Sequence, residues 1–292
     1  MLTNLNALMQ YAQEHKMAIG SFNGPTLESA RAAVEAAQEL GVPLILQHAP
    51  AHDPYISLEL AGKIMLALAE QATVPVCVHL DHGHSLETVM RAIRTGYTSV
   101  MYDASGKPFE QNLQETRKIV RMAHAVNVSV EAELGNLPHN FHGEMTDENP
   151  EAFYTNPEDA RRFVKETGVD ALAIAFGTVH GVYKAKPKLS FDVIRRVREA
   201  TGGLPLVMHG GSGLSDEDYR TAIACGIRKI NYYTYGVKYA GEAVQQVIAD
   251  FKSKNADANV YWHDMTMAAY QRLYEDFTSV IKVFANGADP VA

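Results

Sequence analysis

The chain has 292 residues, of which 47% are hydrophobic and 21% are charged, and its formal net charge at pH 7 is −8. These values are ordinary for a globular protein and exclude a disordered or fibrous chain. An acidic chain without a basic run is a poor candidate for non-specific nucleic-acid binding. No apolar run approaches the roughly 20 residues that cross a bilayer, and the N-terminus does not resemble a signal peptide. We therefore expect a cytoplasmic enzyme that binds neither nucleic acid nor membrane.

Eight short apolar runs alternate with amphipathic stretches along the chain. Most of the runs are rich in Val, Ile and Leu without clean alternation, which is typical of parallel strands buried on both faces. The predicted strands are Ala18–Phe22, Pro43–Gln47, Pro75–Leu80, Thr98–Tyr102, Val128–Glu133, Ala171–Phe176, Pro205–Met208 and Arg228–Asn231. The predicted helices between them are Leu27–Leu40, Leu58–Gln71, Ser85–Thr95, Phe109–Ala125, Pro157–Thr167, Phe191–Ala200 and Ser215–Ala224.

This alternation predicts an α/β fold, a (β/α)8 TIM barrel, with an open doubly wound sheet as the alternative. The even number of strands and the absence of a GxGxxG motif after the first run favour the barrel. Two further stretches after the last strand, Val237–Phe251 and Met265–Phe284, are predicted to be helical. We interpret them as the last barrel helix and a C-terminal extension of about residues 252–292 within a single domain, residues 1–292.

Histidines follow three of the predicted strands, at the end of the barrel where the active sites of such folds lie. His82 follows the third strand, His180 the sixth and His209 the seventh, and each is next to a glycine. Three nitrogen ligands with one position left open are the form of a catalytic zinc site. These residues therefore predict zinc at the barrel mouth. His79, which lies inside the third run, is expected to be a hydrogen-bonded core residue, and most other histidines are expected to be structural or solvated.

Asp81 directly precedes His82 and has two interpretations. It could orient a metal ligand, or it could transfer protons to a substrate held on the metal. Adjacent residues that leave a strand point to different sides, so Asp81 is poorly placed to hydrogen-bond the ring of His82. We therefore favour proton transfer.

A glycine-rich segment follows the seventh predicted strand and precedes Ser215, a predicted helix cap. The loops after strands seven and eight are the usual phosphate site of such barrels, because backbone N–H groups there can approach an anion closely. The alternative is that the glycines only permit a tight turn. Lys184, on the loop after the sixth strand, could add a positive charge or could simply be solvated. The candidate phosphate ligands are Gly210, Gly211, Ser212, Asn231 and Thr234.

At these residues the chain resembles the zinc-dependent class II ketose-bisphosphate aldolases, in the branch that holds the fructose- and tagatose-bisphosphate enzymes. The matching motifs run in the family's order over most of the chain. They are Ser21–Asn23, Leu80–Gly83, Met101–Ser105, Pro108–Asn112, Glu131–Gly135, Tyr154–Pro157, Gly177–Tyr183, His209–Gly213 and Lys229–Asn231.

The resemblance implies reversible aldol cleavage of a ketose 1,6-bisphosphate or a ketose 1-phosphate to dihydroxyacetone phosphate and an aldehyde. It implies that His82, His180 and His209 bind the catalytic zinc. It also implies that Asp81 is the proton donor to the aldehyde oxygen. Glu133 matches a carboxylate that approaches the metal in some members.

The resemblance also implies how the rest of the substrate is held. Asp103 and Ser105 match a second metal or a position adjacent to the substrate, from which they would support the metal site. Backbone groups near Gly181 and Gly210 could hold a monovalent cation, Na⁺ or K⁺. The chain is expected to form a homodimer or a homotetramer. The residues implied to bind the substrate are Asn23, Gly181, Gly210, Gly211, Ser212, Asn231 and Thr234.

Two segments depart from the family's pattern. The long polar segment Gly135–Asn156 follows the fifth strand, and a loop of this length is expected to be functional or mobile. In the family it carries the base that enolises the ketone, and Glu144 is the nearest candidate here. The segment after the second strand, Gln47 to Tyr55, contains no Lys or Arg and includes Asp53. We therefore expect a weaker preference for a phosphorylated aldehyde than in typical members, with ketose 1-phosphates as substrates.

Three other functions were weighed against this one. A zinc-dependent barrel hydrolase would need an HxH pair on the first strand, and Ala18–Phe22 has none. A catalytically inactive aldolase-like partner subunit would tend to lose the metal ligands, which this chain keeps. An aldolase that uses a Schiff base would need a lysine at the end of the sixth strand, and none is present there.

Overall fold

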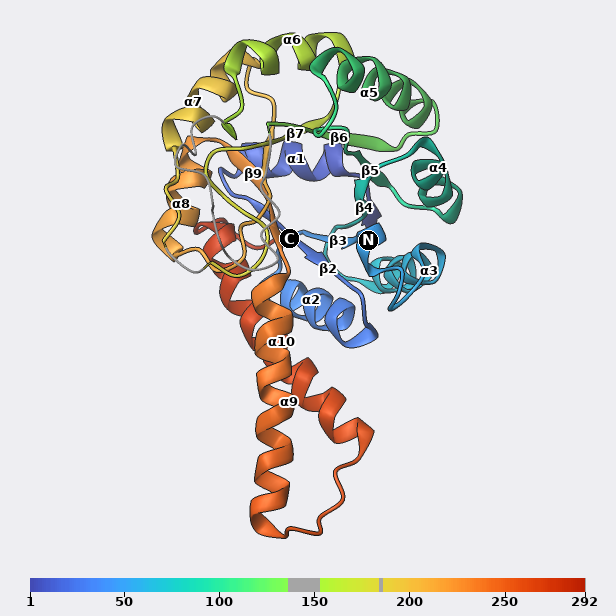
Figure 1. The fold of residues 1–292 in the computed structure, drawn as a ribbon, viewed down its shortest axis with the longest axis vertical. Coiled ribbons are helices and arrows are strands. Elements are labelled where there is room, and N and C mark those ends of the chain that lie inside the picture. Colours follow the sequence, from blue (N-terminus) through green and yellow to red (C-terminus); the bar gives the residue numbers. More distant parts are fainter. Residues whose placement is uncertain (136–152, 184–185, 292) are drawn as a thin grey trace.

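The computed structural model describes residues 1–135, 153–183 and 186–291. Eight parallel strands form a closed ring, because the last strand pairs with the first strand of the ring (Figure 1). The strands of the ring are β2 (Ile19–Asn23), β3 (Leu44–His48), β4 (Val76–Gly83), β5 (Ser99–Tyr102), β6 (Ser129–Leu134), β7 (Ala171–Ile174), β8 (Leu206–Met208) and β9 (Ile227–Tyr232). A two-residue strand, β1 (Leu2–Thr3), pairs with the start of β4. The predicted (β/α)8 barrel is confirmed.

Helices surround the ring, and their bounds agree with the prediction to within one residue at each end. They are α2 (Leu27–Leu40), α3 (Leu58–Gln71), α4 (Leu86–Thr95), α5 (Phe109–His124), α6 (Pro157–Thr167), α7 (Phe191–Ala200) and α8 (Asp216–Cys225). The agreement has a local cause. The side chains of Ser57, Ser85 and Ser215 accept hydrogen bonds from N–H groups of the first turn, and Gly41 and Gly96 end their helices in the left-handed conformation.

One helix, α1 (Leu5–Glu14), is not predicted by the sequence analysis. The side chain of Asn4 caps it, and its apolar face, including Leu8 and Met9, is buried. This helix contacts β2, β4, β6 and β9, and the N–H of Asn6 donates to Ser129 at the start of β6. It therefore closes the end of the barrel opposite the carboxyl ends of the strands (Figure 1).

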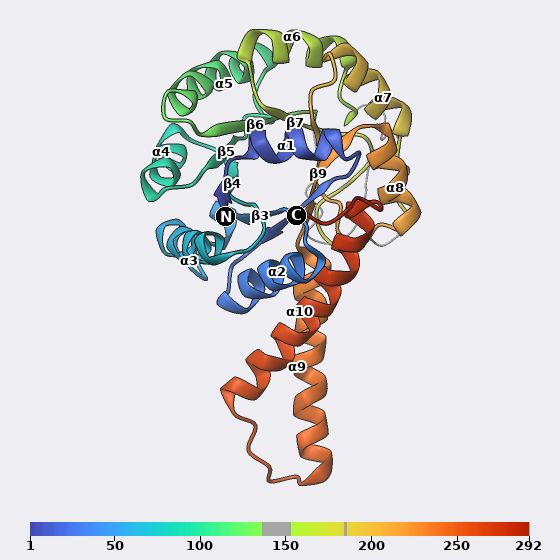
Figure 2. The same ribbon diagram turned by 180° about the vertical axis from the view of Figure 1, so that it is seen from behind.

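The two C-terminal helices are longer than predicted: α9 spans Thr234–Lys254 and α10 spans Trp262–Ala285. They form a hairpin that projects from the barrel, and the second half of α10 returns beside α2 (Figure 2). Its aromatic side chains complete the core, since the rings of Phe22 and Phe277 lie 4.5 Å apart. Among the described residues, no helix is long and apolar enough to span a bilayer.

Candidate active site

The carboxyl ends of three strands bring His82, His180 and His209 together. His82 is the second-last residue of β4, His180 follows β7 and His209 directly follows β8. One ring nitrogen of each lies within 4.8 Å of the other two. The ring centroids of His82 and His209 are 4.7 Å apart, and those of His82 and His180 are 5.3 Å apart. This spacing fits three nitrogen ligands around one metal ion.

The backbone of His82 is locally unusual. Its φ of 46° lies in the left-handed region, which residues other than glycine rarely adopt. Strand β4 reaches Gly83, three residues beyond its predicted end, because Gly83 pairs with Tyr102 after a register shift. Such backbone conformations persist where the surrounding structure imposes them, and they occur often at functional sites.

Asp103, after β5, orients the ring of His82. Its carboxylate can only accept, so Nδ1 of His82, at 2.8 Å, carries the proton and Nε2 keeps a lone pair for a metal. The backbone N–H and the hydroxyl of Ser105 donate to the other oxygen of Asp103 at 3.0 and 2.7 Å. Burial raises the pKa of Asp103, but the hydrogen bonds from His82 and Ser105 outweigh it and hold the pKa below its usual range. His84, by contrast, is largely exposed.

His209 is oriented in the same way, by Glu131. Oε1 of Glu131 lies 3.0 Å from Nε2 of His209, which assigns the proton to Nε2 and leaves Nδ1 as an acceptor. Oε2 of Glu133 lies 3.0 Å from Nδ1, yet neither atom has a hydrogen-bond partner among the described residues. Two acceptors facing each other in a buried site call for a cation between them. This donor set, with Glu133 also close to His82 and Asp103, therefore fits a metal ion.

The electrostatics of His209 agree with that interpretation. Burial lowers the pKa of His209, but the hydrogen bond to Glu131 and the negative charges of Glu131 and Glu133 raise it to about 10. The two carboxylates therefore favour positive charge at this position, whether a proton or a metal ion supplies it.

Three side-chain amides hold the carboxylate of Asp81. Asn23 and Gln47 donate to Oδ2 at 3.1 and 3.2 Å, and Asn231 donates to Oδ1 at 3.1 Å. Oδ1 also lies 3.8 Å from Nε2 of His82, which is too long for a hydrogen bond. Burial raises the pKa of Asp81, but the charges of His82, His209 and Lys229 outweigh it and keep the group ionised.

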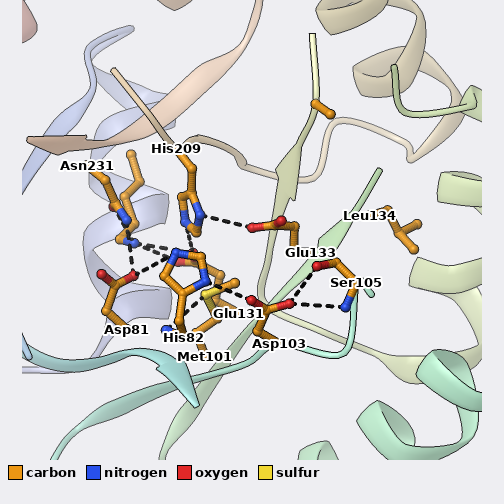
Figure 3. A network of polar contacts seen from close by, with 12 residues as sticks. Asp81, His82, Met101, Asp103, Ser105, Glu131, Glu133, Leu134, His209 and Asn231 are labelled. Carbon is orange, nitrogen blue, oxygen red and sulfur yellow. Dashed lines mark hydrogen bonds and ion pairs between the residues drawn. The ribbon is translucent and has the colours of Figure 1, made fainter. Parts of the chain in front are cut away.

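A buried ionic network lies beneath these groups, in the interior of the barrel (Figure 3). Nζ of Lys229 lies 2.9 Å from Glu131 and donates to Oδ1 of Asn231 at 2.8 Å. Lys229 and Glu131 are both fully buried. The network thus connects the partner of His209 to the amide that holds Asp81. His79 lies beside it, and its Nδ1 is 2.8 Å from Ser99, as expected for a hydrogen-bonded core residue.

The roles of Glu131, Lys229 and Gln47 in this site were not predicted from the sequence. A signal for two of them exists, because side chains two residues apart on a strand point to the same side. Glu131 lies two residues before Glu133 on β6, and Lys229 lies two residues before Asn231 on β9. Charged residues at such positions in barrel strands would have to be paired in the interior.

The loops that would bind the phosphate are tied to one another. Gly210 has a φ of 63°, and a Cβ there would lie 2.4 Å from the carbonyl oxygen of Val179, so only glycine fits. The hydroxyl of Tyr183 donates to Gly210 O at 2.7 Å and accepts from Val179 N at 3.1 Å. Ser212 Oγ accepts from Tyr235 N at 2.8 Å, which sets the glycine-rich loop against the first turn of α9.

The remaining predicted site residues lie in the loops at this end of the barrel, contact Asp81, or fall outside the described residues. Gly211 and Thr234 lie in this loop cluster, and Gly181 follows His180 with a φ of 103°. The side chain of Asn231 is engaged with Asp81 and Lys229. Glu144 and Lys184 lie outside the described residues.

Comparisons with known proteins agree with this geometry. The sequence model of the family described as "Fructose-bisphosphate aldolase class-II" matches residues 3–286. The chain is 39% identical over 252 residues to a "Probable fructose-bisphosphate aldolase" of Bacillus subtilis, covering 85% of this chain and 87% of that protein. It is 39% identical over 266 residues to a "Fructose-bisphosphate aldolase" of Staphylococcus aureus, covering 89% of this chain and 88% of that protein.

A solved structure extends the similarity to almost the whole chain. The crystal structure of the YdjI aldolase from Escherichia coli K12 superposes with a TM-score of 0.84 at 35% identity, covering 99% of this chain and 98% of the other. The fold and the sequence thus agree along the same residues. The chain belongs to the class II fructose-bisphosphate aldolase family.

Proposed function

We propose that this aldolase is zinc-dependent and cleaves a ketose phosphate reversibly to dihydroxyacetone phosphate and an aldehyde. The observation that carries the proposal is the convergence of three histidine nitrogens within 4.8 Å at the barrel mouth. Carboxylates fix the second ring nitrogen of His82 and of His209, as is usual for histidines that bind metal. Three nitrogen ligands and an open position favour zinc over magnesium or calcium, which prefer oxygen ligands.

A metal ion held by His82, His180 and His209, with Glu133 nearby, would supply Lewis-acid stabilisation of the negative charge that develops on the ketone half. Asp81 takes the proton from the C4 hydroxyl in cleavage and returns it to the aldehyde oxygen in synthesis. Its three amide donors orient it for this transfer.

Glu144 is proposed as the base that removes the proton from the ketone half in the synthetic direction. Backbone N–H groups of Gly210 and Gly211 and the N-terminus of α9 at Thr234, which the side chain of its N-cap residue Tyr233 does not cap, would bind the phosphate. Asn23, Gly181, Lys184 and Ser212 would complete the binding of the ketone phosphate. Carbonyl groups near Gly181 and Gly210 would hold a monovalent cation.

Metal analysis combined with a partial reaction tests this proposal. The protein should contain about one zinc per chain, and chelation should abolish the exchange of a dihydroxyacetone phosphate C–H proton with solvent. Replacement of His82, His180 or His209 by Ala should remove both zinc and turnover, whereas His15→Ala, an exposed histidine on α1's C-terminus, should not. Full activity in a strong chelator with no detectable metal would contradict the proposal.

The same exchange reaction separates the two proton-transfer residues. Glu144→Gln should slow exchange, because the base acts on the ketone half alone. Asp81→Ala should leave exchange intact, because no aldehyde takes part. Unchanged exchange in the Glu144 variant would direct the search to Asp147, Glu148 or Glu133. The homodimer or homotetramer remains a prediction for solution measurement.

A further inference from the structure

We propose that the residues after β3 and β9 form an acceptor site that recognises the aldehyde half as an uncharged, hydroxylated chain rather than as a phosphate ester. The inference rests on the proposed aldol cleavage and names the substrate class of its second half. The site is formed by His48, His52, Asp53 and Tyr233, which we call the acceptor rim.

The acceptor rim lies at the same end of the barrel as Asp81. His48 ends β3, directly after Gln47, whose amide donates to Asp81. The short 3₁₀ helix Pro50–His52 follows, and the ring of His52 lies 4.7 Å from the ring of Tyr233. Because β2 separates β3 from β9 in the ring, the contact between His52 and Tyr233 spans the carboxyl end of β2.

Two buried ring nitrogens of the acceptor rim lack partners. His48 is fully buried and His52 is 7% exposed, yet Nδ1 of each has no hydrogen-bond partner among the described residues. Buried polar atoms are nearly always hydrogen-bonded, so such atoms at the mouth of a site indicate a ligand group or a bound water molecule. The other nitrogen of His48 is fixed, because Nε2 lies 3.0 Å from Oδ1 of Asp53.

The charges around His52 disfavour a phosphate. The titratable groups that act on it are His48, Asp81 and Asp53, and the two aspartates carry negative charge. Residues 47–55 contain no Lys or Arg. Burial and His48 lower the pKa of His52 against the opposing effect of the two carboxylates, which leaves the ring neutral at pH 7. A phosphate dianion placed here would meet two like charges and no compensating cation in this segment.

A hydroxyl group fits the same surroundings. A neutral imidazole nitrogen either donates or accepts, depending on the tautomer, and a hydroxyl can pair with either form, whereas a phosphate dianion only accepts. Tyr233 is half-buried and adds a phenolic hydroxyl to the rim. The acceptor rim therefore fits a polyol chain that carries an aldehyde.

The test compares kcat/KM for a ketose 1,6-bisphosphate and for the corresponding ketose 1-phosphate on the same metal-loaded enzyme. We expect the two values to agree within about tenfold, because the second phosphate gains no ion pair. His52→Ala and Tyr233→Phe should each lower kcat/KM for the ketose 1-phosphate about 5- to 100-fold, mainly through KM. His15→Ala, an exposed histidine at the opposite end of the barrel, is the matched control and should not change it.

A variant that should gain activity on the bisphosphate provides a second test. Asp53→Asn removes one repulsive charge and should raise the relative kcat/KM for the bisphosphate about three- to tenfold. A wild-type preference for the bisphosphate above about 10³-fold would overturn the proposal, since it would require a second phosphate site. Unchanged kcat/KM in both His52→Ala and Tyr233→Phe would overturn it as well.

Exchange of a dihydroxyacetone phosphate C–H proton with solvent distinguishes failure of the acceptor-rim proposal from failure of the proposed aldol cleavage. Exchange needs only the metal, the base and the phosphate loops. An enzyme that catalyses exchange but prefers the bisphosphate contradicts the acceptor rim alone. An enzyme that catalyses no metal-dependent exchange contradicts the aldol mechanism itself.

Discussion

We call Glu131, Lys229 and His209 the floor of the active site. The floor and the acceptor rim lie toward the same end of the barrel, but they are built from different kinds of residues. In the floor, Glu131, Lys229 and His209 form ion pairs and hydrogen bonds at 2.9 to 3.0 Å. In the rim, Nε2 of His48 is paired with Asp53, and Nδ1 of His48 and of His52 has no hydrogen-bond partner among the described residues. The floor is thus fixed by charge, whereas the rim leaves ring nitrogens that a ligand could hydrogen-bond, as proposed above.

The two regions also differ in their supports. In the floor, Glu131 and Lys229 lie on β6 and β9, whose backbones are held by neighbouring strands on both sides, and His209 directly follows β8. His52 and Asp53 lie on a single short turn after β3. If the proposed rim binds the aldehyde, substitutions in the turn should change which aldehyde binds without disturbing His82, His180 and His209. A barrel that keeps its chemistry on strands and its specificity on loops separates the two properties.

The largest effect is expected for Asp81→Ala, which acts on the floor side of this comparison. Loss of a general acid–base group should reduce turnover about 10²- to 10⁴-fold. Zinc should stay bound, because Asp103 and Glu131, not Asp81, contact His82 and His209 within hydrogen-bond distance. Steady-state kinetics and metal analysis of the same preparation check both statements. Loss of zinc would show instead that Asp81 orients the metal site.

A smaller effect is expected for Lys229→Met, which removes the cation of the floor. Glu131 would then be a buried carboxylate without its ion pair, and His209 would be held less well. We expect zinc affinity to fall about 10- to 100-fold, as is usual when the partner of a metal ligand is lost. Competition with a chelator measures the affinity, and Lys229→Arg should restore part of it.

Thermal unfolding measures the structural part of this role. Breaking a buried ion pair costs about 3–5 kcal/mol of stability, so Lys229→Met should also unfold at a lower temperature. Glu131→Gln is the informative comparison, because it removes the negative charge while keeping an acceptor for His209. If the double variant Lys229→Met/Glu131→Gln binds zinc as weakly as Lys229→Met, the unpaired charge does not explain the defect.

Much of the fold could be predicted from the sequence, because its strands are short apolar runs that recur between amphipathic stretches and its helices carry local capping signals. The three histidines could be predicted for a related reason, since strand ends in such a barrel converge. Helix α1 was missed because its short, mixed sequence resembles a disordered terminus until Leu8 and Met9 pack under the barrel. Lys229 and Glu131 were missed because a buried charge gives no sign of its partner until the strands are placed side by side.

The smallest effect concerns the pH dependence of stability at the acceptor rim. Burial of His52, with His48 nearby, holds its pKa below the ordinary value in the folded protein. As the pH falls through about 6.5, the unfolded chain therefore binds a proton that the folded chain does not yet bind. His52 thus favours folding above this pH and progressively less below it, by at most about 1.4 kcal/mol per pH unit.

Urea unfolding of the wild type and of His52→Asn tests the sign of this pH dependence. The measurements are made at matched metal content at pH 5.5, 6.5 and 7.5, about one unit either side of the ordinary histidine pKa. The stability of the wild type relative to the variant should decrease as the pH falls, because only the wild type carries the titrating ring. A relative stability that rises on acidification would mean that His52 is protonated in the folded protein. The rim would then carry a positive charge suited to a phosphate, and the contrast with the floor would disappear.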